Sequence, residues 1–190
     1  DFNHSGGRRC ATDVKKELEK LINDDVDGIV IDLRNNGGGS LRDVVEIGGY
    51  FVNSGPIVQV RGRMNMIRPL ADYDSKIVYA GPLVIMIDQS SASASEILAA
   101  AMQDYNRAII IGSESSYGKG TVQRFMNLDN FVSESDKDLM PIGAIKYTMQ
   151  KFYRINGGAT QLKGVESDVV TPDNFMYIET GEKEMDHAMG

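Results

Sequence analysis

Apolar residues recur three or four positions apart in three segments of the chain, which is the spacing of helices that bury one face. Short, almost continuous apolar runs of the kind that form buried strands accompany these segments. The spacing predicts helices over residues 12–23, 41–47 and 97–105, and strands over residues 28–31, 83–87 and 107–111. Because helices and strands alternate, we expect an α/β core with parallel strands.

The pattern of apolar and polar residues changes after Gly120. Residues 121–126 and 144–154 have strand-like composition, and the polar segment between them, which carries four acidic residues, is expected to form a mobile loop or lid. Residues 179–190 are polar without usable periodicity and are expected to be frayed. A chain of 190 residues fits one domain. We therefore predict a single α/β domain over residues 1–178 with an additional C-terminal β region.

Composition excludes several classes of function. The chain is 42% hydrophobic and 25% charged, which is typical of a globular domain. With 20 basic and 27 acidic residues its net charge is −7, so nucleic acid and anionic membrane surfaces are disfavoured as partners. The two histidines, His4 and His187, lie near opposite ends, and no metal-binding spacing occurs, so we expect no metal site. Cys10 is the single cysteine and cannot form an internal disulfide.

Three loops that each follow a predicted strand carry candidate chemistry. The first contains the glycine triplet Gly37, Gly38 and Gly39 and leads into a helix. Glycines allow positive φ and close approach of a ligand atom, so the backbone N–H groups of this loop could bind an oxyanion or a phosphate. A plain tight turn between strand and helix explains the same glycines equally well.

The second loop, residues 88–96, is rich in serine and opens a helix. Ser93 and Glu96 have the spacing of a capping box, which needs no function to explain it. A serine at a helix N-terminus is also surrounded by free N–H groups and by the positive end of the helix dipole, where an oxyanion would be stabilised. The two interpretations are compatible.

The third loop, residues 112–123, places Lys119 between two glycines. It superficially resembles a phosphate-binding loop, but five residues instead of four separate its glycines, and Gly120 stands where Ser or Thr is required. An isolated lysine is usually a solvated surface charge. As a general base it would need its pKa lowered from about 10.4 to about 7–8. This shift requires that the ammonium form be destabilised by about 4 kcal/mol relative to the neutral amine, and burial can provide that destabilisation. Gln123 lies on the same face of the following strand and could hold the lysine in position.

Taken in order, the motifs DLRNNGGGSL, SSASASEILAAAMQDYNRAIIIG and YGKGTVQ resemble those of the carboxyl-terminal processing (tail-specific) proteases. The resemblance runs from about Asp13 to Asp173. It implies that Ser93 is the nucleophile, Lys119 the general base and Gln123 its orienting partner. It also implies an oxyanion hole formed by the amide of Ala94 and that of Gly38 or Gly39, a layered core shared with crotonases and Clp-type proteases, and no cofactor.

This family resemblance implies a serine-type endopeptidase that hydrolyses proteins near apolar C-termini through an acyl-enzyme, in the bacterial periplasm or cell envelope. Members usually carry a PDZ domain, for which this chain has no segment left over, and homo-oligomer formation is left open. One alternative is a non-catalytic peptide-binding or ligand-binding module on the same fold. Another is a crotonase-like enzyme acting on acyl-CoA, which would leave the serine and lysine motifs without a role.

Overall fold

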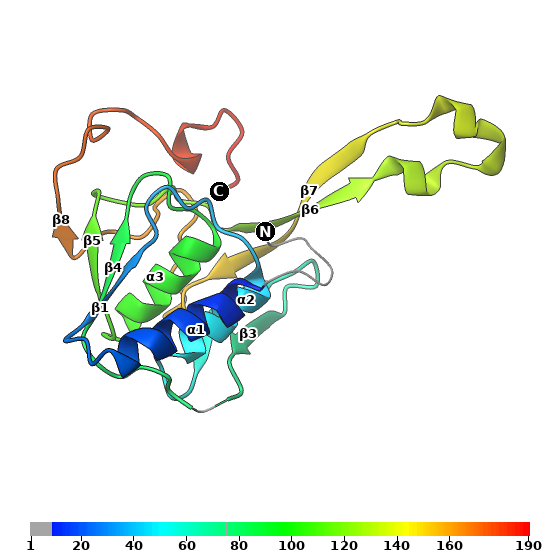
Figure 1. Ribbon diagram of the computed structural model, residues 1–190. Coiled ribbons are helices and arrows are strands. Elements are labelled where there is room, and N and C mark those ends of the chain that lie inside the picture. The colour runs from blue at the N-terminus through cyan, green and yellow to red at the C-terminus, as the bar shows by residue number, and fades with distance from the viewer. Residues whose placement is uncertain (1–8, 75) are drawn as a thin grey trace.

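A parallel sheet forms the centre of the computed structural model, which describes residues 9–74 and 76–190 (Figure 1). Its strands lie in the order β1-β4-β5-β8. They span Ile29–Asp32 (β1), Leu83–Ile87 (β4), Ile109–Gly112 (β5) and Val169–Val170 (β8). Every neighbouring pair is parallel. The predicted α/β class with parallel strands is therefore confirmed, and the C-terminal ends of β1, β4 and β5 share one edge of the sheet.

Three helices lie side by side, and they are α1 (Cys10–Asn23), α2 (Leu41–Gly49) and α3 (Ala94–Asp104). Helix α3 lies against the parallel sheet, and α2 lies between α3 and α1 (Figure 1). Helices α1 and α3 begin before the first apolar residue of their predicted segments, because hydrophobic spacing marks the buried face of a helix and not its first turn. No helix among the described residues has the length and apolarity needed to span a bilayer.

The hydrophobic core lies between the helices and the parallel sheet and extends to strands β2 (Pro56–Arg61) and β7 (Ala144–Tyr153) of a second sheet. Ile85, Ile87 and Ile110 of the central strands have no exposed surface. Helix α3 is buried along most of its length, through Ile97, Leu98, Ala99, Ala100, Ala101 and Met102. Full burial of one large aliphatic side chain contributes about 1.5–3 kcal/mol. This packing fixes the position of α3 and of Ser93, which directly precedes it.

A second sheet is antiparallel and has the order β3-β2-β7-β6. Its strands are β2 (Pro56–Arg61), β3 (Ile67–Ala71), β6 (Thr121–Asn127) and β7 (Ala144–Tyr153). The predicted strands over 121–126 and 144–154 are confirmed as β6 and β7. No strand was predicted for residues 56–71, where β2 and β3 form a hairpin. Pairing of Gln59 with Tyr153 joins that hairpin to the C-terminal β region.

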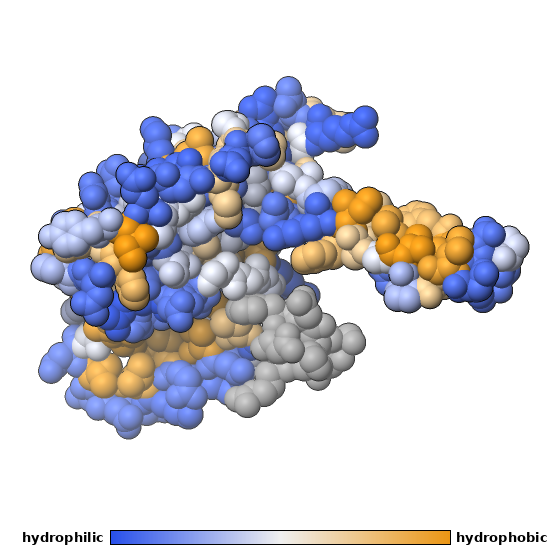
Figure 2. All heavy atoms as spheres, turned by 90° about the horizontal axis from the view of Figure 1, so that it is seen from above, coloured by the Kyte–Doolittle hydropathy of each residue, from blue (hydrophilic) through white to orange (hydrophobic). Residues whose placement is uncertain are grey.

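Strands β6 and β7 continue beyond the sheet as a two-stranded arm, here defined as residues 122–150, that projects from the body of the molecule (Figure 1). The acidic segment expected to be a loop or lid forms its tip, with the short 3-10 helices η1 (Leu128–Phe131) and η2 (Glu134–Leu139). Apolar side chains cover part of the arm (Figure 2). Phe125 and Phe131 are 75% and 71% exposed.

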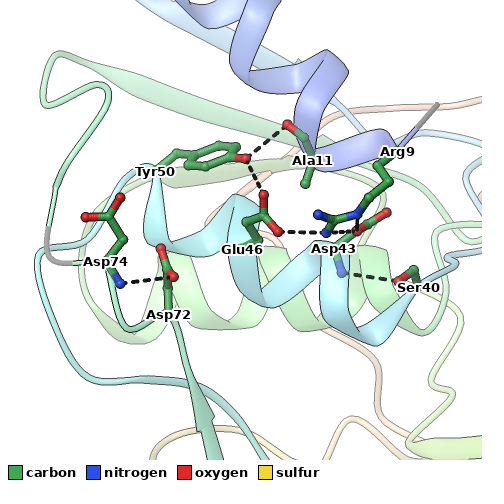
Figure 3. A network of polar contacts seen from close by, with 8 residues as sticks. All are labelled: Arg9, Ala11, Ser40, Asp43, Glu46, Tyr50, Asp72 and Asp74. Carbon is green, nitrogen blue, oxygen red and sulfur yellow. Dashed lines mark hydrogen bonds and ion pairs between the residues drawn. The ribbon is translucent and has the colours of Figure 1, made fainter.

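A polar network fixes helix α2, which follows the glycine triplet, to the start of α1 (Figure 3). Arg9 donates to Asp43 Oδ1 through Nε at 3.0 Å and to Glu46 Oε2 through Nη2 at 2.7 Å. The Tyr50 hydroxyl donates to the carbonyl of Ala11 at 3.0 Å. Asp43 is buried, so the guanidinium that neutralises it also stabilises the helix on which it lies. This anchoring limits the freedom of the loop immediately before α2.

The C-terminal residues 179–190, expected from the sequence to be frayed, contact the body at several points. They include the short helix η3 (Glu182–Glu184). The amide of Glu182 donates to the carbonyl of Tyr117 at 2.9 Å, and Gln161 Nε2 donates to the carbonyl of Met189 at 2.9 Å. These contacts bring the tail next to the loop that carries Lys119.

Candidate active site

The three loops selected from the sequence meet at one edge of the parallel sheet. The glycine triplet follows β1, Ser93 follows β4, and Lys119 follows β5. The C-terminal edge of a parallel sheet is where open α/β folds place their ligand sites. Backbone hydrogen bonds tie the loops together: the carbonyl of Asn36 accepts from Ala92 N at 3.0 Å, and that of Ser91 accepts from Tyr117 N at 3.0 Å.

Ser93 has a strained backbone conformation, with φ 57° and ψ −111°. A residue with a Cβ rarely adopts positive φ, and such strain costs about 1–3 kcal/mol, which the surroundings must offset. Two hydrogen bonds hold the serine there. Its amide donates to Glu96 Oε2 at 2.7 Å, and its carbonyl accepts from Ile97 N at 2.9 Å. The sharp turn from strand to helix presents a half-buried hydroxyl at the N-terminus of α3.

Gly38 packs directly against the peptide that follows Ser93. Its φ is +95°, and a Cβ added there would lie 2.5 Å from the carbonyl oxygen of Ala92 and 2.8 Å from the amide nitrogen of Ala94. Only glycine fits this approach. The amide of Gly38 donates to Asn36 Oδ1 at 3.0 Å. Among the described residues, the amides of Gly39 and Ala94 form no hydrogen bond, so both remain available to a ligand.

A pocket of about 280 Å³ brings the predicted site residues together. Its polar and glycine lining consists of Gly37, Gly38, Gly39, Ser93, Lys119, Thr121 and Gln123. Its apolar lining comes from Leu41, Ala94, Ile97, Val122 and Phe152. In the described part of the chain, Lys119 Nζ forms no hydrogen bond with Ser93 Oγ or with Gln123, which is exposed at the rim. Catalytic hydrogen bonds often tighten only when substrate binds.

The loop that carries Lys119 is held from two sides through its backbone. On one side the amides of Gly118 and Lys119 donate to the Glu96 carboxylate at 2.7 and 2.9 Å. On the other side residues 160–162 bond to it, with Leu162 N donating to Gly118 O at 2.8 Å and Gly120 N donating to Gln161 Oε1 at 2.7 Å. Each backbone N–H and C=O group of residues 118–120 has a partner outside the loop. The lysine therefore projects from a rigid support.

Burial lowers the pKa of Lys119 from its usual value, and repulsion by Lys146 lowers this pKa further. Attraction by Glu182 and Glu96 acts in the opposite direction and is the smaller effect. The shift has the sign that a lysine general base requires, because more of the amine is neutral at a given pH. The sequence predicted this suppression by burial, and the geometry adds Lys146 as a second cause.

Glu96 is the site residue whose role the sequence did not reveal. Its spacing from Ser93 indicated a helix cap, and the hydrogen bond from Ser93 N is indeed formed. The same carboxylate is fully buried and also accepts from Ser116 Oγ and Gly118 N, both at 2.7 Å, and from Lys119 N. Burial raises the pKa of Glu96, while these hydrogen bonds pull the pKa back towards its usual range. A glutamate followed some 20 residues later by Ser, Gly and Lys gives no pattern from which this contact could be read.

No group of three or more His, Cys, Asp or Glu side chains is arranged to hold a metal ion within residues 9–74 and 76–190. The groups that converge on the pocket are instead a hydroxyl, an amine and backbone N–H donors. These groups suit nucleophilic acyl transfer.

Comparisons with known proteins agree with this arrangement. The family model for peptidase family S41 matches residues 2–171. The chain is 50% identical over 177 residues to the tail-specific protease of Haemophilus influenzae, covering 93% of this chain and 25% of that protein. It is 35% identical over 160 residues to the carboxy-terminal-processing protease of Bartonella bacilliformis, covering 83% of this chain and 34% of that protein. The chain thus spans about a quarter to a third of the length of these relatives.

Among solved structures, the photosystem II D1 C-terminal processing protease superposes with a TM-score of 0.69 at 30% identity, covering 85% of this chain and 39% of that one. A strand-to-helix turn that exposes a serine, a lysine on a supported loop and a match over nearly the whole chain therefore coincide. The chain belongs to peptidase family S41, the family of the tail-specific and carboxyl-terminal processing proteases.

Proposed function

We propose that this chain is the catalytic part of a serine-type endopeptidase that cleaves protein substrates near their C-termini, with Ser93 as nucleophile and Lys119 as general base. One observation carries the proposal: Ser93 and Lys119 line the same pocket, and the backbone amides of both are fixed by the carboxylate of Glu96. The shared support sets the distance between two groups that must exchange a proton.

In the proposed mechanism, neutral Lys119 Nζ takes the proton of the Ser93 hydroxyl as Oγ attacks the substrate carbonyl carbon. The tetrahedral intermediate collapses, the C–N bond breaks, and the leaving amine receives the proton from the Lys119 ammonium. Water then attacks the Ser93 ester as Lys119 Nζ takes its proton, the bond between the acyl carbon and Oγ breaks, and the Lys119 ammonium returns the proton to Ser93 Oγ, which releases the acid product and restores the enzyme. Gln123, at the rim beside Lys119, is proposed to orient the amine once substrate is bound.

The proposed oxyanion hole consists of two backbone N–H groups. Ala94 N lies at the N-terminus of α3, where the helix dipole favours negative charge. Of the two glycines predicted from the sequence, Gly39 has an amide without a hydrogen-bond partner among the described residues, whereas that of Gly38 is engaged with Asn36. This difference supports Gly39 as the second donor, with Gly38 allowing the loop to approach Ser93.

The names of the relatives suggest the substrate class. A tail-specific protease and carboxy-terminal-processing proteases imply substrates recognised at their C-termini. The apolar lining of the pocket, with Leu41, Ile97, Val122 and Phe152, supports apolar residues near the scissile bond. A bacterial periplasmic or envelope location is proposed on the same similarity.

The test is covalent labelling with a fluorophosphonate probe, which reacts with an activated serine. We expect wild-type protein to be labelled at Ser93, as located by mass spectrometry, and Ser93→Ala and Lys119→Ala to remain unlabelled while staying folded. Hydrolysis of peptides with apolar C-termini should be lost in the same two variants. Labelling that persists in Lys119→Ala would contradict the role of the lysine. Peptide binding without labelling in the wild type would instead favour a binding module.

A further inference from the structure

Gln161 lies outside the three catalytic motifs, yet it touches the loop that carries Lys119. Its Oε1 accepts from the amide of Gly120 at 2.7 Å, one residue after the lysine. The contact is close along the backbone as well, because a Cβ on Gly120 would lie 2.8 Å from the amide nitrogen of Gln161. A side chain that reaches across 41 positions to bond this amide restrains the peptide from which the base projects.

The other end of the Gln161 amide is held by the tail. Residues 181–189, here called the tail strap, run past the lysine loop. Gln161 Nε2 donates to the carbonyl of Met189 at 2.9 Å and makes a longer contact of 3.4 Å with Glu182 Oε1. The strap is itself anchored on the loop, because Glu182 N donates to Tyr117 O at 2.9 Å. Gly181 has φ +114°, and a Cβ there would lie 2.7 Å from the same Tyr117 oxygen.

From these contacts we propose that Gln161 is a positioning residue for Lys119, and that the tail strap holds Gln161 in that role. The inference rests on the proposed function of Lys119 as general base. Gln161 is not among the residues that line the pocket, and its side chain forms no hydrogen bond with Ser93 or with Lys119 in the described part of the chain, so we infer that it acts through the Gly120 peptide. The tail thereby becomes part of the structure that supports the catalytic base.

Electrostatics also link the tail strap to the base, but with the opposite effect on its basicity at a given pH. The charged groups that act on Lys119 are Lys146 from the arm, Glu96 from α3 and Glu182 from the strap. Glu182 raises the pKa of Lys119, opposing burial. Displacing the strap therefore removes a restraint from the Lys119 loop and a negative charge from its surroundings, and both changes should be visible in the pH profile of labelling.

The experiment compares two substitutions of Gln161 in the chain that carries this sequence. Gln161→Met keeps the length of the side chain but removes the acceptor for Gly120 N, so we expect fluorophosphonate labelling of Ser93 to slow about tenfold. Gln161→Glu keeps the acceptor for Gly120 N but loses the donor to Met189 O, so the Gly120 amide should stay bonded while the strap is released. Labelling should recover in part at high pH, with the profile moved upward because the added negative charge raises the pKa of Lys119. Gly181→Ala should displace the strap and slow labelling at high pH, where Lys119 is neutral with or without Glu182, as Gln161→Met does.

Gln103→Met is the matched control. Gln103 is also half-buried and donates to Glu166 O at 2.9 Å and Asp168 Oδ1 at 2.8 Å, but it lies at the opposite end of α3 from Ser93. Ser93 should be labelled in Gln103→Met at the wild-type rate.

Hydrogen–deuterium exchange gives a readout that does not depend on activity. The amide of Gly120 should exchange faster in Gln161→Met than in wild type, and should be protected again in Gln161→Glu. The inference would be overturned if Gln161→Met had the labelling rate, the pH profile of labelling and the Gly120 amide protection of the wild type. Loss of Gly120 protection in Gln161→Glu that is as complete as in Gln161→Met would also overturn it, because the acceptor oxygen would then not be what holds the Gly120 amide. A wild-type protein that is not labelled would count against the proposed function, while the exchange comparison would still test Gln161.

Discussion

The backbone amides of Ser93 and Lys119 donate to a single atom, Glu96 Oε2, at 2.7 and 2.9 Å. The two residues are 26 positions apart and follow different strands, yet one buried carboxylate sets the relative position of their peptides. The other oxygen of Glu96 fixes Ser116 and Gly118. The site is thus organised around an acceptor that has no chemical role of its own in the proposed mechanism.

Replacing Glu96 with Gln should therefore damage both stability and labelling. Each oxygen of Glu96 receives two donors, so an amide NH₂ group in either position would face two N–H or O–H groups. Leaving buried donors unpaired costs about 1–3 kcal/mol each. We expect a lower midpoint in denaturant and at least a hundredfold slower labelling of Ser93. Glu19→Gln, at an exposed position of α1, should change neither quantity, and wild-type labelling in Glu96→Gln would refute this role.

Gly38→Ala tests the close approach of the glycine loop. The added methyl group would collide with Ala92 O and Ala94 N in a backbone conformation that alanine disfavours. We expect a loss of about 1–3 kcal/mol in unfolding free energy and no measurable labelling. Gly62→Ala is the control, because Gly62 lies outside the pocket that Ser93 lines and a Cβ there would meet only the Gln150 side chain, at 3.6 Å and beyond. Similar labelling rates for the two variants would show that the approach is unimportant.

The pH dependence of labelling should follow Lys119. Its pKa lies below the usual lysine value, so the rate should rise as pH increases through that lowered pKa, when the amine becomes neutral. Lys146→Gln removes a positive charge that contributes to the lowering, so the rising limb should move to higher pH. Lys137→Gln, on the tip of the arm, should leave the limb in place. An unchanged limb in Lys146→Gln would contradict the influence of Lys146.

Stability gives an independent check on the same lysine. Between the lowered pKa of folded Lys119 and its ordinary value, the unfolded chain binds more protons, so wild-type stability should rise with pH in that window. At lower pH the half-buried ammonium opposes folding. Lys119→Met, which keeps most of the aliphatic stem, should therefore be at least as stable as wild type at neutral pH while losing all labelling. A marked drop in its melting temperature would indicate that the charge is needed for folding.

Local patterns in the sequence predicted those parts of the molecule whose structure is decided locally. Alternation of helical and strand-like spacing gave the parallel sheet, and the loops after residues 31, 87 and 111 proved to lie at one edge, as parallel strands require. The pKa of Lys119 is lowered by burial, in the direction that the sequence predicted. Pairing of β2 with β7 escaped prediction because it joins residues 90 or more positions apart.

The supports of the site were hidden for a similar reason. Glu96 was interpreted as a helix cap because its bond to Ser93 spans three residues. Its bonds to Ser116, Gly118 and Lys119 form only because the loop after β5 lies next to the start of α3. Gln161 offered no signal at all, since a glutamine in a polar stretch is usually solvated. Contacts that form only when distant segments meet leave no periodic trace in the chain.

The position of the candidate site at the C-terminal ends of β1, β4 and β5 also determines where further segments can be added to such a domain. The opposite ends of these strands, near Gly28, Pro82 and Ala108, are separated from the pocket by the length of a strand, about 13–17 Å for four or five residues. Additional segments joined on that side would leave the distances between the proposed nucleophile, base and amide donors unchanged. A longer protein, such as the relatives of which this chain covers 25% and 34%, can thus carry further segments on that side without rebuilding the site.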